Sequence, residues 1–253
     1  MMDPTVHASE DERKRQILSL IRNRIWSHAV TVRVSKMVDN REDSWNTATG
    51  VFLELGDRRF VLTAWHVVER FDEIRSLGGL AVVVLGNVAI AEPKYVFLDE
   101  RNDLIVLEVS EFAIPAFNAV PYRPTRAWPP PRLTVGDPVM ICGFPAMFRS
   151  DEDEILHGDL TYFGEVESVS EHQFVVQIQG ELEDAGRVPF PELNSDFGGV
   201  SGCPAFVLYS DHMQLAGIFS QSAVSAPVWV IRSIANLPAN LAELAPMNSR
   251  EDR

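Results

Sequence analysis

The feature that most constrains the fold of this chain is a long succession of short segments rich in β-branched and aromatic residues, each bounded by turn residues. In the first half these segments lie at 29–35, 49–55, 58–64, 80–86, 94–99 and 103–109. In the second half they lie at 137–144, 159–169, 172–179, 203–209, 214–220 and 227–232. Such segments predict strands, and two groups of about six strands predict an all-β fold of two antiparallel six-stranded β-barrels side by side.

A proline-dense stretch, AVPYRPTRAWPPPRL at 119–133, separates the two groups of segments. It has no periodicity, so we expect an extended linker rather than a buried element. Ser9 and Glu12 form a capping box ahead of apolar residues at helical spacing. They predict an amphipathic helix over about 9–26 that packs on the body, with a partner-binding helix as the alternative. A short C-terminal helix, interrupted by Pro238, is expected after 232.

These features divide the chain into five parts. They are an N-terminal tail and helix (1–28), a first barrel (29–118), the linker (119–133), a second barrel (134–232) and a C-terminal helix and tail (233–253).

The charge balance excludes several kinds of partner. Lys and Arg total 22 and Asp and Glu total 36, which gives a formal net charge of -14. Nucleic acids and anionic membrane surfaces require a concentrated basic patch, so we expect neither as a partner. The N-terminal segment MMDPTVHASEDERKRQ has no apolar signal region, and no apolar run is long enough to span a bilayer. A cytoplasmic location is therefore predicted.

Three polar residues stand where a serine-based acyl transfer could be built. Ser201 lies in FGGVSGCPAF (197–206), His66 follows a predicted strand in VLTAWHVVER at a strand-to-turn edge, and Asp103 opens the predicted strand DLIVLEV. The reaction needs a hydroxyl, an imidazole that takes its proton and a carboxylate that orients the imidazole. Each residue alone has an ordinary explanation, namely a turn serine, a half-buried histidine and a turn-forming aspartate.

Taken together, five blocks in order resemble the trypsin-like (chymotrypsin-fold) serine peptidases, in particular the HtrA-like and related stand-alone bacterial members. The blocks are ATGVFLELGDRRFVLTAWHVV (48–68), NDLIVLEV (102–109), VGDPVMICGFP (135–145), GVSGCPAF (199–206) and LAGIFSQ (215–221). They are similar to the family's T-A-x-H-V block, its D-L-A-V-L strand, its first second-barrel strand, its G-x-S-G-x-P motif and its G-I-x-S segment. The resemblance covers about 29–232.

The resemblance implies a serine endopeptidase that hydrolyses peptide bonds through an acyl-enzyme, without a metal or a cofactor. By position, Ser201 would be the nucleophile, His66 the general base and then acid, and Asp103 the orienting carboxylate. The backbone N–H groups of Gly199 and Ser201 would form the oxyanion hole. The substrate would be a protein or a peptide, and a regulatory protein partner is possible.

The same resemblance assigns substrate contacts to Ser195, Ser220, Gln221 and Ser222. The serines carry no charge, which disfavours a preference for Arg or Lys before the scissile bond. Asp196 adjoins the expected pocket floor, and a one-residue shift of the loop would reverse this interpretation.

Two residues depart from the family pattern. Val200 stands where Asp or Asn is usual, so we expect no activation by a newly freed N-terminus. Cys203 replaces a common glycine and is either a small buried hydrophobe or a redox-sensitive thiol near Cys142. These departures keep open an alternative function, a catalytically silent homologue that binds peptides.

Overall fold

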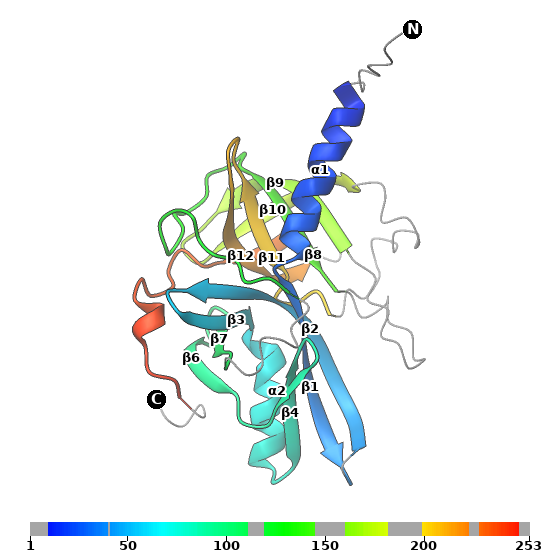
Figure 1. The fold of residues 1–253 in the computed structure, drawn as a ribbon, viewed down its shortest axis with the longest axis vertical. Helices are drawn as coiled ribbons and strands as arrows, with labels where there is room; N and C mark the ends of the chain where they lie inside the picture. Colours follow the sequence, from blue (N-terminus) through cyan, green and yellow to red (C-terminus); the bar gives the residue numbers. More distant parts are fainter. Residues whose placement is uncertain are drawn as a thin grey trace, which may run out of the picture.

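The computed structural model describes residues 10–39, 41–110, 119–144, 160–181, 199–222 and 228–247 (Figure 1). The chain begins with α1 (Glu10–Trp26), and the first unit then contains β1 (Ala29–Val38), β2 (Arg41–Leu55), β3 (Arg58–Ala64), α2 (Trp65–Ser76), β4 (Leu80–Leu85), β5 (Val88–Ile90), β6 (Lys94–Asp99) and β7 (Leu104–Glu108). The second contains β8 (Pro138–Gly143), β9 (Leu160–Val169), β10 (Gln173–Glu181), β11 (Pro204–Leu208), β12 (Met213–Ser222) and β13 (Val228–Ser233), followed by a 3-10 helix, Leu241–Glu243.

The strands form two antiparallel sheets, which confirms the predicted fold class. The second unit closes into a six-stranded barrel in the order β10-β13-β12-β11-β8-β9. The first unit differs from the predicted six-stranded barrel, because its described strands form a seven-stranded sheet, in the order β5-β4-β1-β2-β3-β7-β6, rather than a closed barrel. The extra strand β5 spans only Val88–Ile90, too short to show an alternating pattern.

Strand periodicity determines which side chains face the core. In β1, Val30, Val32 and Val34 are buried and alternate with more exposed residues, as expected for a sheet with one apolar face. In β8 the alternation is between two cores, so the strand is buried on both faces. Val139 and Ile141 lie in the core of the closed barrel, whereas Met140 and Cys142 belong to a larger core shared by the two units.

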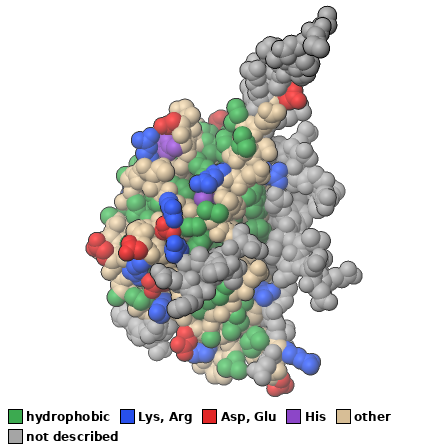
Figure 2. Space-filling view, in the orientation of Figure 1, with side chains coloured by type: hydrophobic (Ala, Val, Ile, Leu, Met, Phe, Trp, Pro, Cys, Tyr) green, Lys and Arg blue, Asp and Glu red, His purple; other side chains and the backbone are tan. Residues whose placement is uncertain are grey.

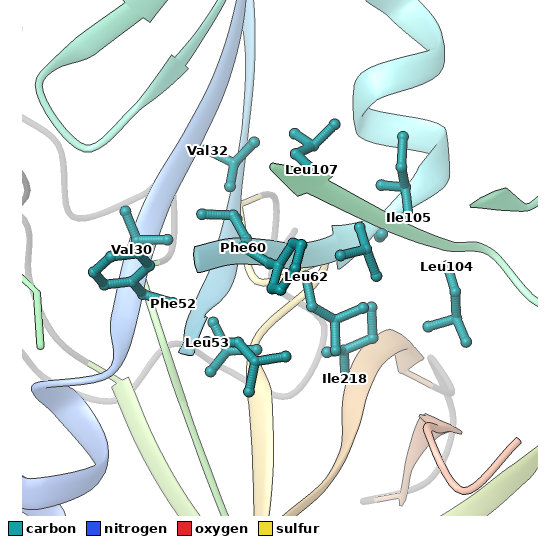
Figure 3. Packing of buried hydrophobic residues seen from close by; sticks show 14 of the residues in the cluster. Val30, Val32, Phe52, Leu53, Phe60, Leu62, Leu104, Ile105, Leu107 and Ile218 are labelled. Carbon is teal, nitrogen blue, oxygen red and sulfur yellow. The ribbon is translucent and has the colours of Figure 1, made fainter. Parts of the chain in front are cut away.

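The shared core joins the two units into one packed body. Among the residues labelled in Figure 3, Ile218 of β12 packs with residues of the first sheet, including Leu62 and Leu104. Tyr122, in the connection between the units, is also buried in this cluster. Its N–H donates to Phe52 O at 2.7 Å, and its carbonyl accepts from Glu54 N at 2.9 Å. The prediction of a linker that is not buried is therefore wrong at Tyr122, because its ring packs against both units.

The two predicted helices differ from the prediction in extent. The helix α1 begins at Glu10, so Ser9 of the predicted capping box lies outside the described residues. Figure 1 shows α1 projecting from the body. Ile25, in the last turn, is buried, while Ile17 and Leu20 are exposed. In place of the predicted C-terminal helix, the described residues form a single 3-10 turn, Leu241–Glu243, after Pro238.

The described surface is mixed in charge. On the face drawn in Figure 2, basic and acidic side chains are interspersed among hydrophobic and neutral ones. No helix among the described residues combines the length and apolarity needed to cross a membrane.

Candidate active site

The pairing of β3 with β7 brings His66 to Asp103. Ala64 is the last residue of β3 and pairs with Leu104, the first of β7, so the residues just outside these strands lie side by side. His66 Nδ1 lies 2.9 Å from Asp103 Oδ2, and the His66 backbone N–H donates to Asp103 Oδ1 at 2.9 Å. The carboxylate thus contacts both the ring and the backbone of His66.

His66 lies in the first turn of α2 and not at a strand-to-turn edge as expected. The helix buries Val67, Val68, Phe71 and Ile74, whose spacing is helical, against the first sheet. Its N-cap is Ala64, which makes no side-chain capping hydrogen bond, so the start signal for a helix is absent from the sequence. A rigid helix and a strand therefore position the imidazole.

The backbone of Asp103 is in the left-handed region, with φ of 56°. Asp is one of the few non-glycine residues that adopt this conformation readily. Its carbonyl accepts from Trp65 N at 3.2 Å, a second link between the start of α2 and the start of β7.

Burial of the Asp103 carboxylate favours its neutral form, but its hydrogen bonds favour the ion. Burial alone would raise the pKa of Asp103. The hydrogen bonds and charge of His66, with a hydrogen bond from Ser220, outweigh this effect and hold the pKa below its ordinary value. The Ser220 hydroxyl donates to Asp103 Oδ2 at 3.2 Å. Asp103 is therefore ionised at neutral pH.

Ser201 approaches His66 from the second unit. It lies in the turn that precedes β11, and its Oγ is 3.1 Å from His66 Nε2. Because Nδ1 faces a carboxylate, which can only accept, Nδ1 carries the proton and Nε2 is the acceptor for the serine hydroxyl. The structure thus brings together all three residues singled out in the sequence, at distances suited to proton transfer.

The loop around Ser201 is held by its carbonyls. Ser201 O accepts from Thr49 N at 2.9 Å, and Val200 O accepts from Cys203 N at 2.9 Å. Gly199 has φ of 89°, a conformation that side chains resist. Within the described part of the chain, no acceptor contacts the N–H groups of Gly199 and Ser201.

The residues predicted to contact substrate lie in three situations. Ser195 lies outside the described residues. Ser220 and Gln221 lie on β12, where the Ser220 hydroxyl is turned to Asp103 and Gln221 is exposed. Ser222 ends β12 and pairs with Trp229. The pairing of β11 with β12 reaches only Ile218, so the β11-facing edge beyond Ser220 has no strand partner among the described residues.

Val200 and Cys203 both point into the core of the closed barrel. Val200 is 1% exposed, so an ionised side chain there would be costly. Cys203 is also buried, which raises the pKa of its thiol to about 12. A β-carbon on Gly143 would lie 1.6 Å from Cys203 Sγ, so the glycine makes room for this sulfur.

Cys142 and Cys203 are free and belong to different cores. These facts favour the small buried hydrophobe over the redox-sensitive thiol for Cys203.

Sequence reasoning missed Thr49 altogether. It is fully buried, and its hydroxyl donates to Gly199 O at 3.1 Å across 150 positions of sequence. A contact of such range leaves no local signal. Among the described residues, no group of three or more His, Cys, Asp or Glu side chains could hold a metal ion.

Comparison with known proteins adds one match. The family model described as a trypsin-like peptidase domain matches residues 48–215. This span begins one residue before Thr49 and includes His66, Asp103 and Ser201. A comparison with curated proteins finds no match.

Proposed function

The chain belongs to the trypsin-like peptidase domain family, and we propose that it is a serine endopeptidase acting through an acyl-enzyme. The observation that carries the proposal is the hydrogen-bonded series from Asp103 through His66 to Ser201, with distances of 2.9 Å and 3.1 Å. Each residue then has the role that its protonation state permits.

In the acylation step, Ser201 Oγ attacks the carbonyl carbon of the scissile peptide bond. The hydroxyl proton passes to His66 Nε2, and the ionised Asp103 stabilises the imidazolium that forms. His66 then gives this proton to the leaving amine, and the C–N bond breaks. Water, activated by the same imidazole, hydrolyses the ester, which releases the acid product and restores Ser201.

The negative charge on the attacked oxygen needs donors that are already in place. The N–H groups of Gly199 and Ser201 are the candidates, since neither donates to another described group. Donors directed at this oxygen stabilise the transition state more than the bound substrate, and one such donor is worth about 10²–10³ in kcat.

The substrate would be an extended segment of a protein or peptide. The unpartnered β11-facing edge of β12 beyond Ser220 offers backbone groups for strand addition. Ser195, Ser220, Gln221 and Ser222 are proposed to contact the substrate. A regulatory protein partner and a cytoplasmic location stay predictions.

A fluorophosphonate probe tests the proposal. It phosphonylates a serine only when the hydroxyl is activated, so we expect stoichiometric labelling of the wild type. Ser201→Ala should abolish the labelling, and His66→Ala should slow it by about 10³-fold or more. Undiminished labelling of Ser201→Ala would remove Ser201 as the nucleophile. A folded wild type that neither labels nor cleaves denatured casein would instead favour the silent peptide-binding homologue.

A further inference from the structure

Thr49 is a buried residue of the first unit whose polar groups are directed at the nucleophile loop of the second. It lies in β2 with no exposed surface. Its N–H donates to Ser201 O at 2.9 Å, and its hydroxyl donates to Gly199 O at 3.1 Å. Thr49 therefore contacts the loop, through its backbone N–H and its side-chain hydroxyl, at the two residues whose N–H groups are proposed to bind the oxyanion.

The direction of the Thr49 hydroxyl is set by its neighbours. Phe144 N–H donates to Thr49 Oγ1 at 2.9 Å and occupies one of its lone pairs. A hydroxyl has a single proton, and the Gly199 carbonyl can only accept. The hydroxyl proton therefore points to Gly199 O.

Thr49 is held from its own side as well. Thr63 of β3 donates from its hydroxyl to Thr49 O at 2.7 Å. The threonine is thus a rigid part of the first sheet, so its position does not depend on the loop that it contacts.

The hydrogen bond from Thr49 to Gly199 O restrains the backbone rotation that a glycine would otherwise allow. Gly199 has a positive φ, and a glycine can exchange between orientations of its flanking peptide groups at little cost. Holding its carbonyl fixes the peptide group between Gly199 and Val200. The next carbonyl, Val200 O, accepts a hydrogen bond from Cys203 N. The Val200 carbonyl and the Ser201 N–H belong to one trans peptide plane and point in opposite directions, so this hydrogen bond directs the Ser201 N–H away from Cys203.

We propose that Thr49 is a positioning residue that keeps the Gly199–Ser201 loop in the conformation able to bind the oxyanion. The inference rests on the proposed peptidase function. Thr49 does not touch the reacting atoms, and its effect passes through the loop carbonyls. Since the oxyanion develops only in the transition state, losing this restraint should lower kcat and leave KM almost unchanged.

The test compares Thr49→Val, which keeps the branched shape but has no hydroxyl, with Thr49→Ser, which retains the hydroxyl. We expect Thr49→Val to lower kcat on a fluorogenic peptide, and the rate of fluorophosphonate labelling, by about tenfold or more. KM should change less than about twofold, and Thr49→Ser should recover most of the loss. Equal rates for wild type and Thr49→Val would overturn the inference, as would a loss confined to KM.

Tyr122→Phe is the matched control for destabilisation of the contact between the units. Its buried hydroxyl accepts from Leu215 N at 3.3 Å, so this variant also leaves a backbone N–H of the second unit without its partner. It does not touch the loop, and we expect labelling within about twofold of wild type. A similar fall in both variants would assign the effect of Thr49 to general stability and refute the positioning role.

Crystal structures separate a failure of this inference from a failure of the proposed function. If the wild type is inert, the proposed function fails, and the orientation of the Gly199–Val200 peptide is compared in wild type and Thr49→Val. A rotated peptide in the variant supports the inference, and an unchanged one overturns it. If Thr49→Val does not fold, the inference is tested by the distance between Thr49 Oγ1 and Gly199 O in a crystal structure of the phosphonylated wild type. Thr49 Oγ1 beyond about 3.5 Å from Gly199 O would then refute the contact.

Discussion

Replacing Gly202 with alanine would place a methyl group between the two units, directly beside Ser201. A β-carbon at this position would lie 2.1 Å from Thr49 O and 2.4 Å from Thr63 Oγ1. Gly202 also has a φ of 80°, in the left-handed region. The substitution therefore meets both backbone strain and a close approach of the first sheet.

The magnitude follows from these two effects. A non-glycine residue in the left-handed region costs about 1–2 kcal/mol. Inserting a methyl group into a filled site costs about 1–3 kcal/mol. The upper part of that range applies here, because the nearest atom is a backbone oxygen held by β2. We expect Gly202→Ala to lower the free energy of unfolding by about 3–5 kcal/mol in total.

Gly136→Ala is the control that isolates the close approach. Gly136 has a φ of 90°, but no heavy atom lies within 4 Å of a β-carbon built there. It should lose only the conformational cost of about 1–2 kcal/mol. Both variants gain similarly from the reduced entropy of the unfolded chain, so this gain cancels in the comparison. The difference between them should be about 2 kcal/mol or more.

Urea denaturation followed by tryptophan fluorescence measures both free energies of unfolding. Equal losses for Gly202→Ala and Gly136→Ala, within about 0.5 kcal/mol, would refute the close packing of the Ser201 turn on β2 and β3. Folded Gly202→Ala should also label slowly with fluorophosphonate, because the displaced turn carries Ser201.

Further predictions concern titration, the orienting carboxylate and the thiols. Burial lowers the pKa of His28 from its ordinary value of 6.5, opposed by its hydrogen bond to Val120 and aided by the nearby charge of Arg24. The unfolded chain therefore takes up this proton at higher pH than the folded one. His28 thus contributes to a loss of stability as pH falls below 6.5 toward the lower folded pKa. His28→Gln should flatten this loss in denaturation series between about pH 7.5 and 5, and parallel curves would contradict the reasoning. Asp103→Asn removes the carboxylate but keeps a residue type that tolerates the left-handed backbone. We therefore expect kcat to fall by about 10³–10⁴-fold while the melting temperature changes little. Retained activity would exclude the orienting role of Asp103. Cys142 and Cys203 are buried, so native protein should resist thiol reagents that modify both after unfolding, and rapid native reaction at Cys203 would disprove its inert packing.

The strand pattern predicted most of the fold because period-2 burial is a local property of the chain. Prediction failed where the deciding interactions are not local or where a signal was weak. The helix α2 has helical spacing of Val67, Val68, Phe71 and Ile74, but it starts without a capping side chain. The beginning of β2 is polar in sequence, and it forms a strand because it pairs with β1 up to Arg41.

For the candidate site, the residues with reactive groups were accessible to sequence reasoning, and those that support them were not. His66, Asp103 and Ser201 carry chemistry that is visible in their residue types. Thr49 and the hydroxyl of Ser220 act through contacts made only when two distant parts of the chain pack together. The resemblance assigns Ser220 to substrate contact, and nothing in the neighbouring sequence indicates Asp103 as its partner.

Because the site is divided between two units, this protein could be split into two fragments whose association restores the site. His66, Asp103 and Thr49 come from the chain before the connection, and Ser201 comes from the chain after it. The bond between Thr125 and Arg126 lies in an exposed part of that connection. Two fragments produced by cutting there would each hold an incomplete centre, and serine reactivity would return only when the fragments dock. Fused to a pair of interacting proteins, such fragments would convert an association event into the amplified signal of a cleaved fluorogenic peptide.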